Sequence, residues 1–407
     1  MKKNKNGKGK AKKVLGCIAA VIVILTVVTV IANVICSNKN IELAGTFETV
    51  KTENQLVPEK DANGFYTFTT DETFKVMQIT DVHIGGGWMS AKKDAMALNA
   101  VAAMIKAEKP DLVIATGDIA YPVPFQAGTF NNLTGAKTFA TLMEKLGVYW
   151  TVAFGNHDTE SYSYYNREKV SAFYADSGFK YCLYQPGPED IDGYGNYVIN
   201  VRNTKGELTQ ALFVMDSHSY LPSDPFGIFW KYDNFHENQV AWYEETIENL
   251  TVQNNGKPFT SSLYMHIPLT EHKDAWFEYF NNGKNDTENV KFLGGDAGED
   301  EENMVYCGLG DDRMFEAMLE KGSTKAVFVG HDHKNNFMLE YKGVMMSYGM
   351  SIDYLAYPGI YKQGIQRGCT IINYTPDGNF EIIKENYYQD KYPSQYEKEQ
   401  VTITPVE

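Results

Sequence analysis

The stretch VYWTVAFGNHD, residues 148–158, joins a predicted buried strand to a polar turn, and this junction decides the fold class. Its first seven residues are mainly β-branched, aromatic or small, which favours a strand with both faces covered. Gly155, Asn156, His157 and Asp158 follow directly. Ligands of open α/β sheets bind outside the carboxyl ends of the strands, so this turn is a candidate functional site.

The same junction recurs four more times along the chain. Apolar strands are predicted at 74–80, 112–115, 262–265 and 326–329. The turns after them hold Asp81 and His83, Gly117 and Asp118, His266, and Gly330, His331 and His333. Predicted helices at 91–109 and 138–146 alternate with the first three strands, which indicates a parallel sheet with right-handed crossovers. Further strands are predicted at 197–201, 212–215, 337–341, 344–347, 370–373 and 380–384, and helices near 238–250 and 311–320.

Five of the eight histidines lie in these strand-end turns, and this pattern indicates metal binding. Imidazole together with carboxylate suits Zn, Fe or Mn. Two cations about 3.5–4 Å apart can drive the hydrolysis of a phosphate ester, and an aspartate on a rigid turn can bridge them. For His218, a substrate contact and a loop hydrogen bond are both open. His236 and His272 are expected at the surface.

The ordered set D-x-H, G-D, G-N-H-D, H and G-H-x-H, spread over residues 81–333, resembles the calcineurin-like metallophosphoesterase superfamily. MDSHSY at 215–220 and YMHIPL at 264–269, with an aromatic insertion between them, are similar to a purple-acid-phosphatase-related branch that contains the yeast Dcr2-type phosphatases. The resemblance implies a four-layer α/β/β/α sandwich of two mixed sheets, with a dimetal site at strand ends.

The resemblance also implies a role for each strand-end residue. The first metal would be held by Asp81, His83 and His333, the bridge would be Asp118, and the second metal would be held by Asn156, His266 and His331. His157 would protonate the leaving alkoxide, with Asp158 orienting its ring. The two metal ions would be Fe, Mn or Zn.

Gly117-Asp118-Ile119-Ala120-Tyr121 also fits the purple acid phosphatase form, in which that tyrosine ligates iron. Those enzymes lack a histidine at the position of His83. We expect His83 to be the ligand and Tyr121 a packing or outer-shell residue, because imidazole binds without losing a proton whereas a phenol has a pKa near 10. This assignment predicts a colourless enzyme.

The implied activity is hydrolysis of phosphomonoesters by a metal-bridging hydroxide. One alternative is a phosphodiesterase that acts on cyclic or extracellular nucleotides, and a second is a non-catalytic metal-binding surface module. The chain ends soon after the core, which favours the monoesterase. The ligand pattern itself fits the hydrolysis of a phosphate monoester and of a phosphodiester equally well.

The amino terminus predicts a membrane anchor. Residues 1–36 carry seven lysines and no acid, and Val14–Ala32 is an unbroken apolar run of 19 residues. About 20 apolar residues cross the hydrocarbon layer as a helix, and lysines remain on the cytoplasmic side. The catalytic domain would then lie outside the cytoplasm. The alternative is a secretory signal cleaved after Val30-Ile31-Ala32.

The rest of the chain carries a strong negative charge, because removing these lysines leaves 30 basic against 52 acidic residues, or −22. Such a charge repels polyanions and argues against nucleic-acid binding. The expected organisation is a basic cytoplasmic segment at 1–13, a transmembrane anchor at 14–36, a linker at 37–70, the metallophosphoesterase domain at 71–388 and a tail at 389–407.

Three features outside the motifs complete the expectations. Trp230, Tyr232 and Phe235, in the aromatic insertion at 219–236, are expected to pack on their own domain rather than line a pocket rim. Asp353, Tyr354 and Tyr357 are expected to border the cleft without being catalytic. Among Cys182, Cys307 and Cys369 one disulfide is open, and spacing does not choose it.

Overall fold

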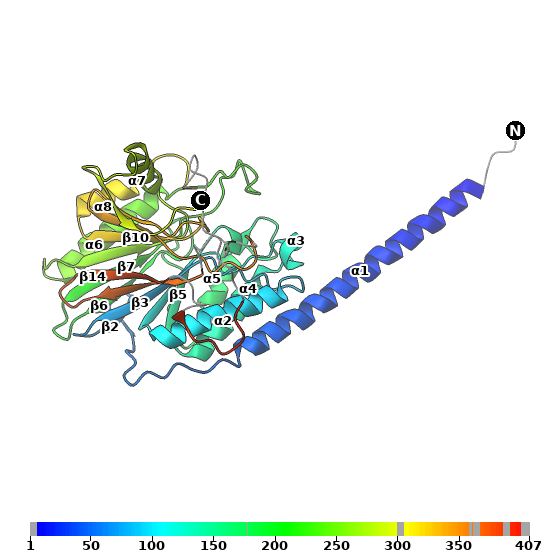
Figure 1. Ribbon diagram of the computed structural model, residues 1–407, viewed down its shortest axis with the longest axis horizontal. Coiled ribbons are helices and arrows are strands. Elements are labelled where there is room, and N and C mark those ends of the chain that lie inside the picture. The colour runs from blue at the N-terminus through cyan, green and yellow to red at the C-terminus, as the bar shows by residue number, and fades with distance from the viewer. Residues whose placement is uncertain are drawn as a thin grey trace.

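Two mixed β-sheets packed face to face carry the fold in the computed structural model (Figure 1), which describes residues 6–176, 178–298, 305–357, 360, 367–385 and 391–399. The smaller sheet has the order β14 (Phe380–Glu385), β13 (Cys369–Tyr374), β3 (Phe74–Ile79), β4 (Leu112–Thr116), β5 (Tyr149–Ala153). The larger sheet has the order β1 (Glu59–Lys60), β2 (Tyr66–Thr69), β6 (Tyr197–Arg202), β7 (Leu208–Val214), β8 (Thr260–Tyr264), β10 (Thr324–Val329), β12 (Val344–Tyr348), β11 (Met338–Tyr341), β9 (Val290–Gly294).

Parallel strands at the centre of each sheet set the position of the site. In the smaller sheet β3, β4 and β5 are parallel, with α2 (Ala91–Glu108) and α4 (Asn132–Leu146) as the intervening helices. In the larger sheet β7, β8, β10 and β12 are parallel. The predicted alternation and the predicted pair of mixed sheets are therefore confirmed.

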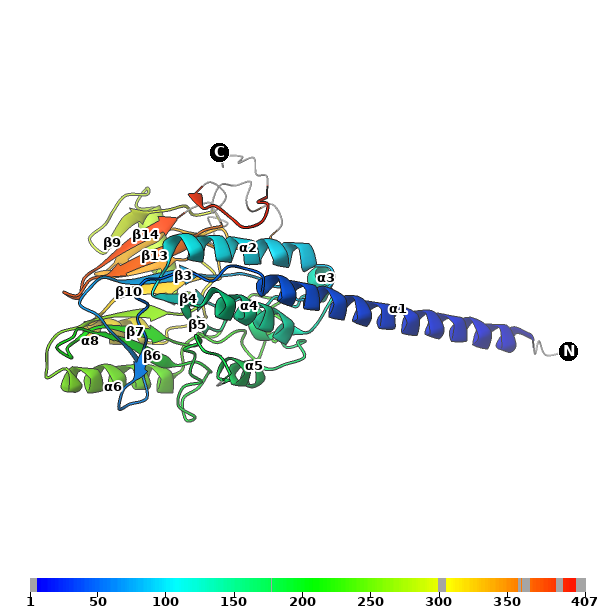
Figure 2. The ribbon, with the colours of Figure 1, turned by 90° about the horizontal axis from the view of Figure 1, so that it is seen from below.

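Helices cover the outer faces of both sheets, which gives the four expected layers (Figure 2). The larger sheet shares one apolar core with α6 (Glu237–Gln253), α7 (Thr270–Asn281) and α8 (Met314–Lys321), and α2 and α4 share the other core with the smaller sheet. Shorter helices, α3 (Pro124–Ala127) and α5 (Arg167–Tyr174), lie in loops between strands. The hydroxyl groups of Tyr264 and Tyr374 meet across the two sheets at 2.8 Å.

Helix α1 (Asn6–Ala44) is both the apolar N-terminal span and part of the folded domain. Side chains from Lys12 through Val28 are exposed, and a half-buried or buried face begins at Thr29 and recurs every three to four residues as far as Ala44. This face packs against α2 and α4. Asn40 donates to the Ala91 carbonyl (3.1 Å) and to the Asp94 carboxylate (3.3 Å).

The segment 37–70, expected as a linker, is not a free tether. Its first residues belong to α1, Phe47 and Val50 are buried in the core, and β1 and β2 extend the larger sheet. The polar composition concealed this, because the partners of residues such as Asn40 lie far away in the sequence. Of the expected 389–407 tail, residues 391–399 are described, and Tyr396 packs on Phe47 with ring centroids 5.2 Å apart. All five cysteines are described, and no disulfide joins any two of them.

Candidate metal centre

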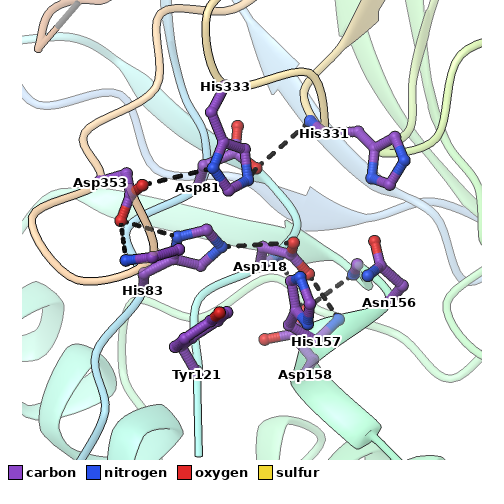
Figure 3. A network of polar contacts seen from close by, with 12 residues as sticks. Asp81, His83, Asp118, Tyr121, Asn156, His157, Asp158, His331, His333 and Asp353 are labelled. Carbon is purple, nitrogen blue, oxygen red and sulfur yellow. Dashed lines mark hydrogen bonds and ion pairs between the residues drawn. The ribbon is translucent and has the colours of Figure 1, made fainter. Parts of the chain in front are cut away.

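The strand-end turns place the predicted residues at one edge shared by both sheets (Figure 3). Asp81 and His83 follow β3, Asp118 follows β4, His266 follows β8, and His331 follows β10. At Asp81, His83, Asp118 and His331 the backbone is left-handed, with φ of 50°, 51°, 53° and 77°. Non-glycine residues held there cost about 1–3 kcal/mol each and cluster at functional sites. The chain therefore sustains backbone strain to aim these side chains.

Asp81, His83, Asp118 and His333 form the first buried cluster, and their ligand atoms lie within 4.8 Å of one another. Nε2 of His83 lies 3.4 Å from Oδ2 of Asp118, and Nε2 of His333 lies 3.5 Å from Oδ1 of Asp81. All four residues are buried. Imidazole nitrogens thus face carboxylate oxygens in a water-poor site.

Asp118, His266 and His331 form the second cluster, also with ligand atoms within 4.8 Å. Nε2 of His266 lies 3.1 Å from Oδ2 of Asp118. Asn156 belongs to the same region, because its neighbour His157 donates its backbone N–H to Oδ1 of Asp118 at 2.8 Å. Asp118 therefore takes part in both clusters, as a bridging ligand must.

The hydrogen bonds of His266 and Asn156 test whether these residues fit a cation. Nδ1 of His266 donates to the Thr116 carbonyl at 2.8 Å, so the neutral ring presents a lone pair at Nε2. That lone pair faces an Asp118 carboxylate oxygen, and two acceptors repel unless a proton or a cation lies between them. Within the described chain, neither His266 Nε2 nor the buried Oδ1 of Asn156 has a hydrogen-bond partner. The donor set therefore fits metal ions.

Electrostatics at this edge also favour a positive charge. Burial lowers the pKa of His266, but the Asp118 carboxylate outweighs it and the net pKa rises to about 9. Burial opposes ionisation of Asp118 as well, yet the neighbouring His266 and His157 hold its pKa well below the ordinary value. A proton that the pocket attracts in this way is displaced when a metal binds.

Asp353, expected only to border the cleft, contacts two histidines of the first cluster. Its carboxylate oxygens lie 3.1 Å from Nδ1 of His83 and 3.3 Å from Nδ1 of His333. Backbone N–H groups of Leu355, Ala356 and Tyr357 donate to the same oxygens at 2.9, 2.7 and 2.8 Å. The carboxylate thus lies beside the Nδ1 atoms of both rings, whose Nε2 atoms lie toward Asp118 and Asp81. Sequence offered little signal for this role, because no histidine or glycine motif surrounds Asp353.

Glu160, rather than Asp158, contacts the ring of His157. Nδ1 of His157 lies 2.6 Å from Oε1 of Glu160, three residues further along a short 3₁₀ turn (His157–Thr159). Burial lowers the pKa of His157, but the Asp118 carboxylate and the Glu160 contact outweigh it and raise the net pKa. The expected orienting role of Asp158 is therefore wrong in this structure. The sequence feature that could have indicated this contact is the three-residue spacing between His157 and Glu160.

Asp158 instead ties the strand-end turns together. Its carboxylate accepts backbone N–H groups from Asp118 (3.0 Å), Ala120 (2.8 Å) and Gly155 (2.8 Å). Burial and the nearby Asp118 carboxylate raise its pKa to about 6. Gly155 is required at this junction because a Cβ there would collide with the Asp118 carboxylate. Asp158 thus supports the shared ligand indirectly.

Tyr121 packs beside the first cluster. Its ring centroid lies 4.7 Å from that of His83 and 4.8 Å from that of His157. Its hydroxyl donates to Oε1 of Gln126 at 3.0 Å, and burial raises the pKa of the phenol. A protonated, hydrogen-bonded hydroxyl agrees with the expected packing role.

The three remaining histidines lie outside the two ligand clusters. Nε2 of His218 pairs with Oε1 of Gln239 at 2.7 Å, and the His218 ring stacks on His236 at 4.1 Å. His236 is partly exposed, as expected. His272 is fully buried on α7 beside Tyr348, which corrects the surface expectation. Burial lowers the pKa of His272 to about 3, so its ring is neutral.

A cavity of about 590 Å³ opens beside the clusters, and His157, His331 and His333 lie in its wall. Trp230 and Tyr232 also line it, so two of the aromatic residues expected to pack on their own domain border the site, while Phe235 is buried in the core. The ring of Tyr232 meets His331 at 4.4 Å. The remaining aromatic lining residues are Tyr121, Tyr162, Tyr220, Phe226, Tyr306 and Tyr357.

Comparison with known proteins finds a matching family model, related sequences and a similar solved structure. A family model described as calcineurin-like phosphoesterase matches residues 74–335. The chain is similar to "Probable inactive purple acid phosphatase 14" of Arabidopsis thaliana, with 29% identity over 317 residues, or 71% of this chain and 73% of that protein. It is also similar to "Phosphatase DCR2" of Saccharomyces cerevisiae, with 26% identity over 288 residues, or 66% of this chain and 46% of that protein. A crystal structure of a dimetal phosphatase from Danio rerio superposes with a TM-score of 0.49 and 11% identity, and the match covers 78% of this chain and 97% of that one.

Proposed function

This chain belongs to the calcineurin-like phosphoesterase family, and from that premise we propose that it is a membrane-anchored phosphatase that hydrolyses phosphate monoesters outside the cytoplasm. The observation that carries the proposal is the pair of buried ligand clusters that share Asp118. A dinuclear phosphoesterase needs two cations held by one bridging anion, and this arrangement supplies the ligands for both.

We assign the first metal to Asp81, His83 and His333 and the second to Asn156, His266 and His331, with Asp118 between them. Carboxylate, amide and imidazole donors suit Fe, Mn or Zn. When bound, such ions neutralise the phosphate ester and make water a stronger nucleophile. Elemental analysis of the purified full chain identifies the ions and tests for two per molecule.

His157 is positioned to protonate the oxygen that leaves phosphorus. Its ring lies in the cavity wall, and its Nδ1 contact with Glu160 leaves Nε2 for the leaving group. The carboxylates around it keep its pKa raised, so the ring carries the proton that the departing alkoxide needs. Tyr220 links the His157–Glu160 pair to the second cluster. Its hydroxyl accepts a hydrogen bond from the Asn156 side-chain amide at 2.8 Å and lies 3.4 Å from Oε1 of Glu160.

The monoester preference draws support from the relatives, whose printed names describe phosphatases. A phosphodiesterase is the alternative within the same site, since the ligands serve either ester. The word "inactive" in the plant relatives' names raises the question of a non-catalytic module. In this chain every expected ligand is present and buried at the site, which supports catalysis.

Turnover by the metal-loaded full chain in detergent tests the proposal. We expect hydrolysis of an aryl phosphate monoester at a higher rate than of the matching diester, and loss of both in Asp118→Asn. Asp377→Asn, on the exposed turn between β13 and β14, is the matched control. Activity on the diester alone would establish the alternative enzyme, and two bound metals without any turnover would establish the module.

The anchor proposal rests on α1. This helix is long and apolar enough to cross a membrane. The apolar span continues without a break into the part of α1 that packs on the domain and ends at Ala44. This continuity supports an uncleaved helix over a signal sequence that is removed. The lysines ahead of it place the amino terminus in the cytoplasm. Intact mass of the membrane-extracted protein distinguishes a chain that starts at Met1 from one that starts at Asn33.

A further inference from the structure

The apolar span of α1 meets the catalytic domain with no spacer between them. Val14–Ala32 has 19 residues, so as a helix it covers about 28 Å, close to the thickness of the hydrocarbon layer. The next residue, Asn33, already touches the domain through its side chain: Nδ2 donates to the Gly128 carbonyl and Oδ1 accepts from the Trp88 backbone N–H, both at 2.9 Å. If α1 is the proposed anchor, the bilayer surface must lie against this part of the domain.

The part in question is the edge that carries the metal centre. Trp88 lies five residues after His83, and Gly128 lies two residues after Gln126, which lines the cavity and holds the Tyr121 hydroxyl. Figures 1 and 2 both show the exposed part of α1 leaving the domain beside α3. The helix therefore projects from the carboxyl edge of the strands, and the opposite edge faces away from the membrane.

Exposed apolar side chains gather on loops of the same edge. We call six of them the apolar rim: Trp88, Phe125, Phe226, Ile228, Phe229 and Trp230. Phe125 is 88% exposed and the last four are 59–69% exposed. Gln126 and Trp230 line the same cavity, so the α3 loop and the 226–230 loop border one opening. An exposed apolar group of this size marks an interaction site, and tryptophan is typical of the membrane interface.

The 226–230 loop is held rigidly in its exposed position. The buried Asp224 carboxylate accepts backbone N–H groups from Ile228 (2.9 Å), Phe229 (2.8 Å) and Lys231 (3.3 Å). Trp230 has a left-handed backbone with φ of 53°. The loop thus presents its apolar side chains outward, although the Trp230 ring also meets the edge of Tyr306 with centroids 5.9 Å apart.

We propose that the apolar rim lies in the interfacial layer of the membrane that α1 spans, so that the cavity opens onto the lipid surface and the substrate is a phosphate monoester carried by a membrane lipid. This inference rests on the proposed anchored phosphatase and adds the substrate class. It follows from two independent observations. Asn33, the first residue after the span, already contacts the domain, and the apolar rim lies on the edge that holds the site.

The first experiment measures the contact without using activity. The full chain is reconstituted in phosphatidylcholine vesicles with or without brominated acyl chains, and tryptophan fluorescence is recorded. Of the five tryptophans, all described, Trp88 and Trp230 are exposed, Trp242 on α6 is half-buried, and Trp150 and Trp276 are buried. We expect brominated lipid to quench the native protein and to quench a Trp88→Phe, Trp230→Phe double variant much less. Equal quenching of the two proteins would overturn the proposal.

The second experiment measures the substrate class. A flexible Gly/Ser insert of about 20 residues between Ala32 and Asn33 leaves the docked half of α1 in place but lets the domain move about 25 Å from the membrane. We expect hydrolysis of phosphatidic acid in the same vesicle to fall at least about tenfold, because the substrate's effective concentration at the cavity falls. Hydrolysis of a soluble aryl phosphate should not change.

A point substitution on the rim should act in the same direction. Phe125→Asp should lower the rate on phosphatidic acid relative to the aryl phosphate, whereas Val252→Asp, on an exposed position (76%) of α6, should leave the ratio unchanged. An unchanged ratio in both the insert and Phe125→Asp, or a preference for a soluble phosphopeptide over phosphatidic acid, would refute the inference. Absence of aryl phosphate turnover in the native protein would instead refute the proposed function, and the quenching result would still decide the membrane contact.

Discussion

Replacing Asp353 with asparagine should weaken metal binding without removing a metal ligand. Each oxygen of the native carboxylate faces one histidine Nδ1, at 3.1 Å for His83 and 3.3 Å for His333. An asparagine keeps one oxygen and turns an NH₂ group toward the other ring and its backbone partner. One of the two histidines therefore loses the charged oxygen beside its Nδ1, which favours the ring orientation with Nε2 toward the metal site.

The expected loss follows from this geometry. Removing the outer partner of a metal-ligating histidine typically lowers metal affinity or activity by about 10–100-fold, or about 1.4–2.7 kcal/mol. Since Asp353 serves two histidines, we expect the upper part of that range. The loss should be largest for the metal assigned to His83 and His333, and the second metal should be retained more tightly.

The assay is a competition titration with a chelator of known affinity, which gives a dissociation constant for each metal in native protein and variant. Asp224→Asn is the matched control, because Asp224 is also buried and also accepts three backbone N–H groups but contacts no assigned ligand. Thermal unfolding of both variants measures the cost of the changed backbone contacts. If Asp353→Asn binds both metals as tightly as the native protein, the positioning role is wrong.

Three further outcomes are expected. Glu160→Gln should shift the alkaline limb of the pH–rate profile to lower pH, because the Glu160 charge raises the pKa of His157 and the ring acts when protonated. The control Glu168→Gln, on α5, should leave the profile unchanged. An alkaline limb that does not move in Glu160→Gln would contradict the role of His157 as the acid. The metal-loaded protein and its Tyr121→Phe variant should both lack a visible charge-transfer band, and a band lost only on substitution would make Tyr121 a ligand. Trp150→Ala should lower the free energy of unfolding in urea by about 3–5 kcal/mol, since Trp150 is fully buried, and a change under about 1 kcal/mol would show that its contacts are dispensable.

The strand-end turns could be predicted because sequence order alone carries the information. An apolar strand followed directly by Asp118 or His266 puts a ligand at the sheet edge whatever the surrounding contacts are. β3 and β4 are parallel neighbours at the centre of the smaller sheet, and β8 and β10 are parallel neighbours at the centre of the larger sheet. The carboxyl ends of these strands meet at one edge of the domain. The fold class and the grouping of the expected ligands follow from these local junctions.

Roles that depend on tertiary contacts could not be predicted in this way. The carboxylate that contacts His157 is Glu160, because a 3₁₀ turn brings position i+3 rather than i+1 beside the ring. Asp353 reaches two histidines, His83 and His333, across 270 and 20 residues of sequence. His272 lies on α7, a helix that was not among those predicted from the sequence. In each case the partner, rather than the residue itself, defines the function.

The Asp94 carboxylate ties the amino-terminal helix to the loop beside the metal centre. It accepts hydrogen bonds from the side-chain amide of Asn40 and from the backbone N–H groups of Gly85 (2.9 Å) and Gly86 (3.0 Å), two and three residues after His83. Cleavage of the chain after Ala44 would remove one of these donors and uncover the apolar faces of α2 and α4. The remaining domain would be less stable and its His83 loop less well held, so the fold favours a chain in which α1 stays attached to the domain.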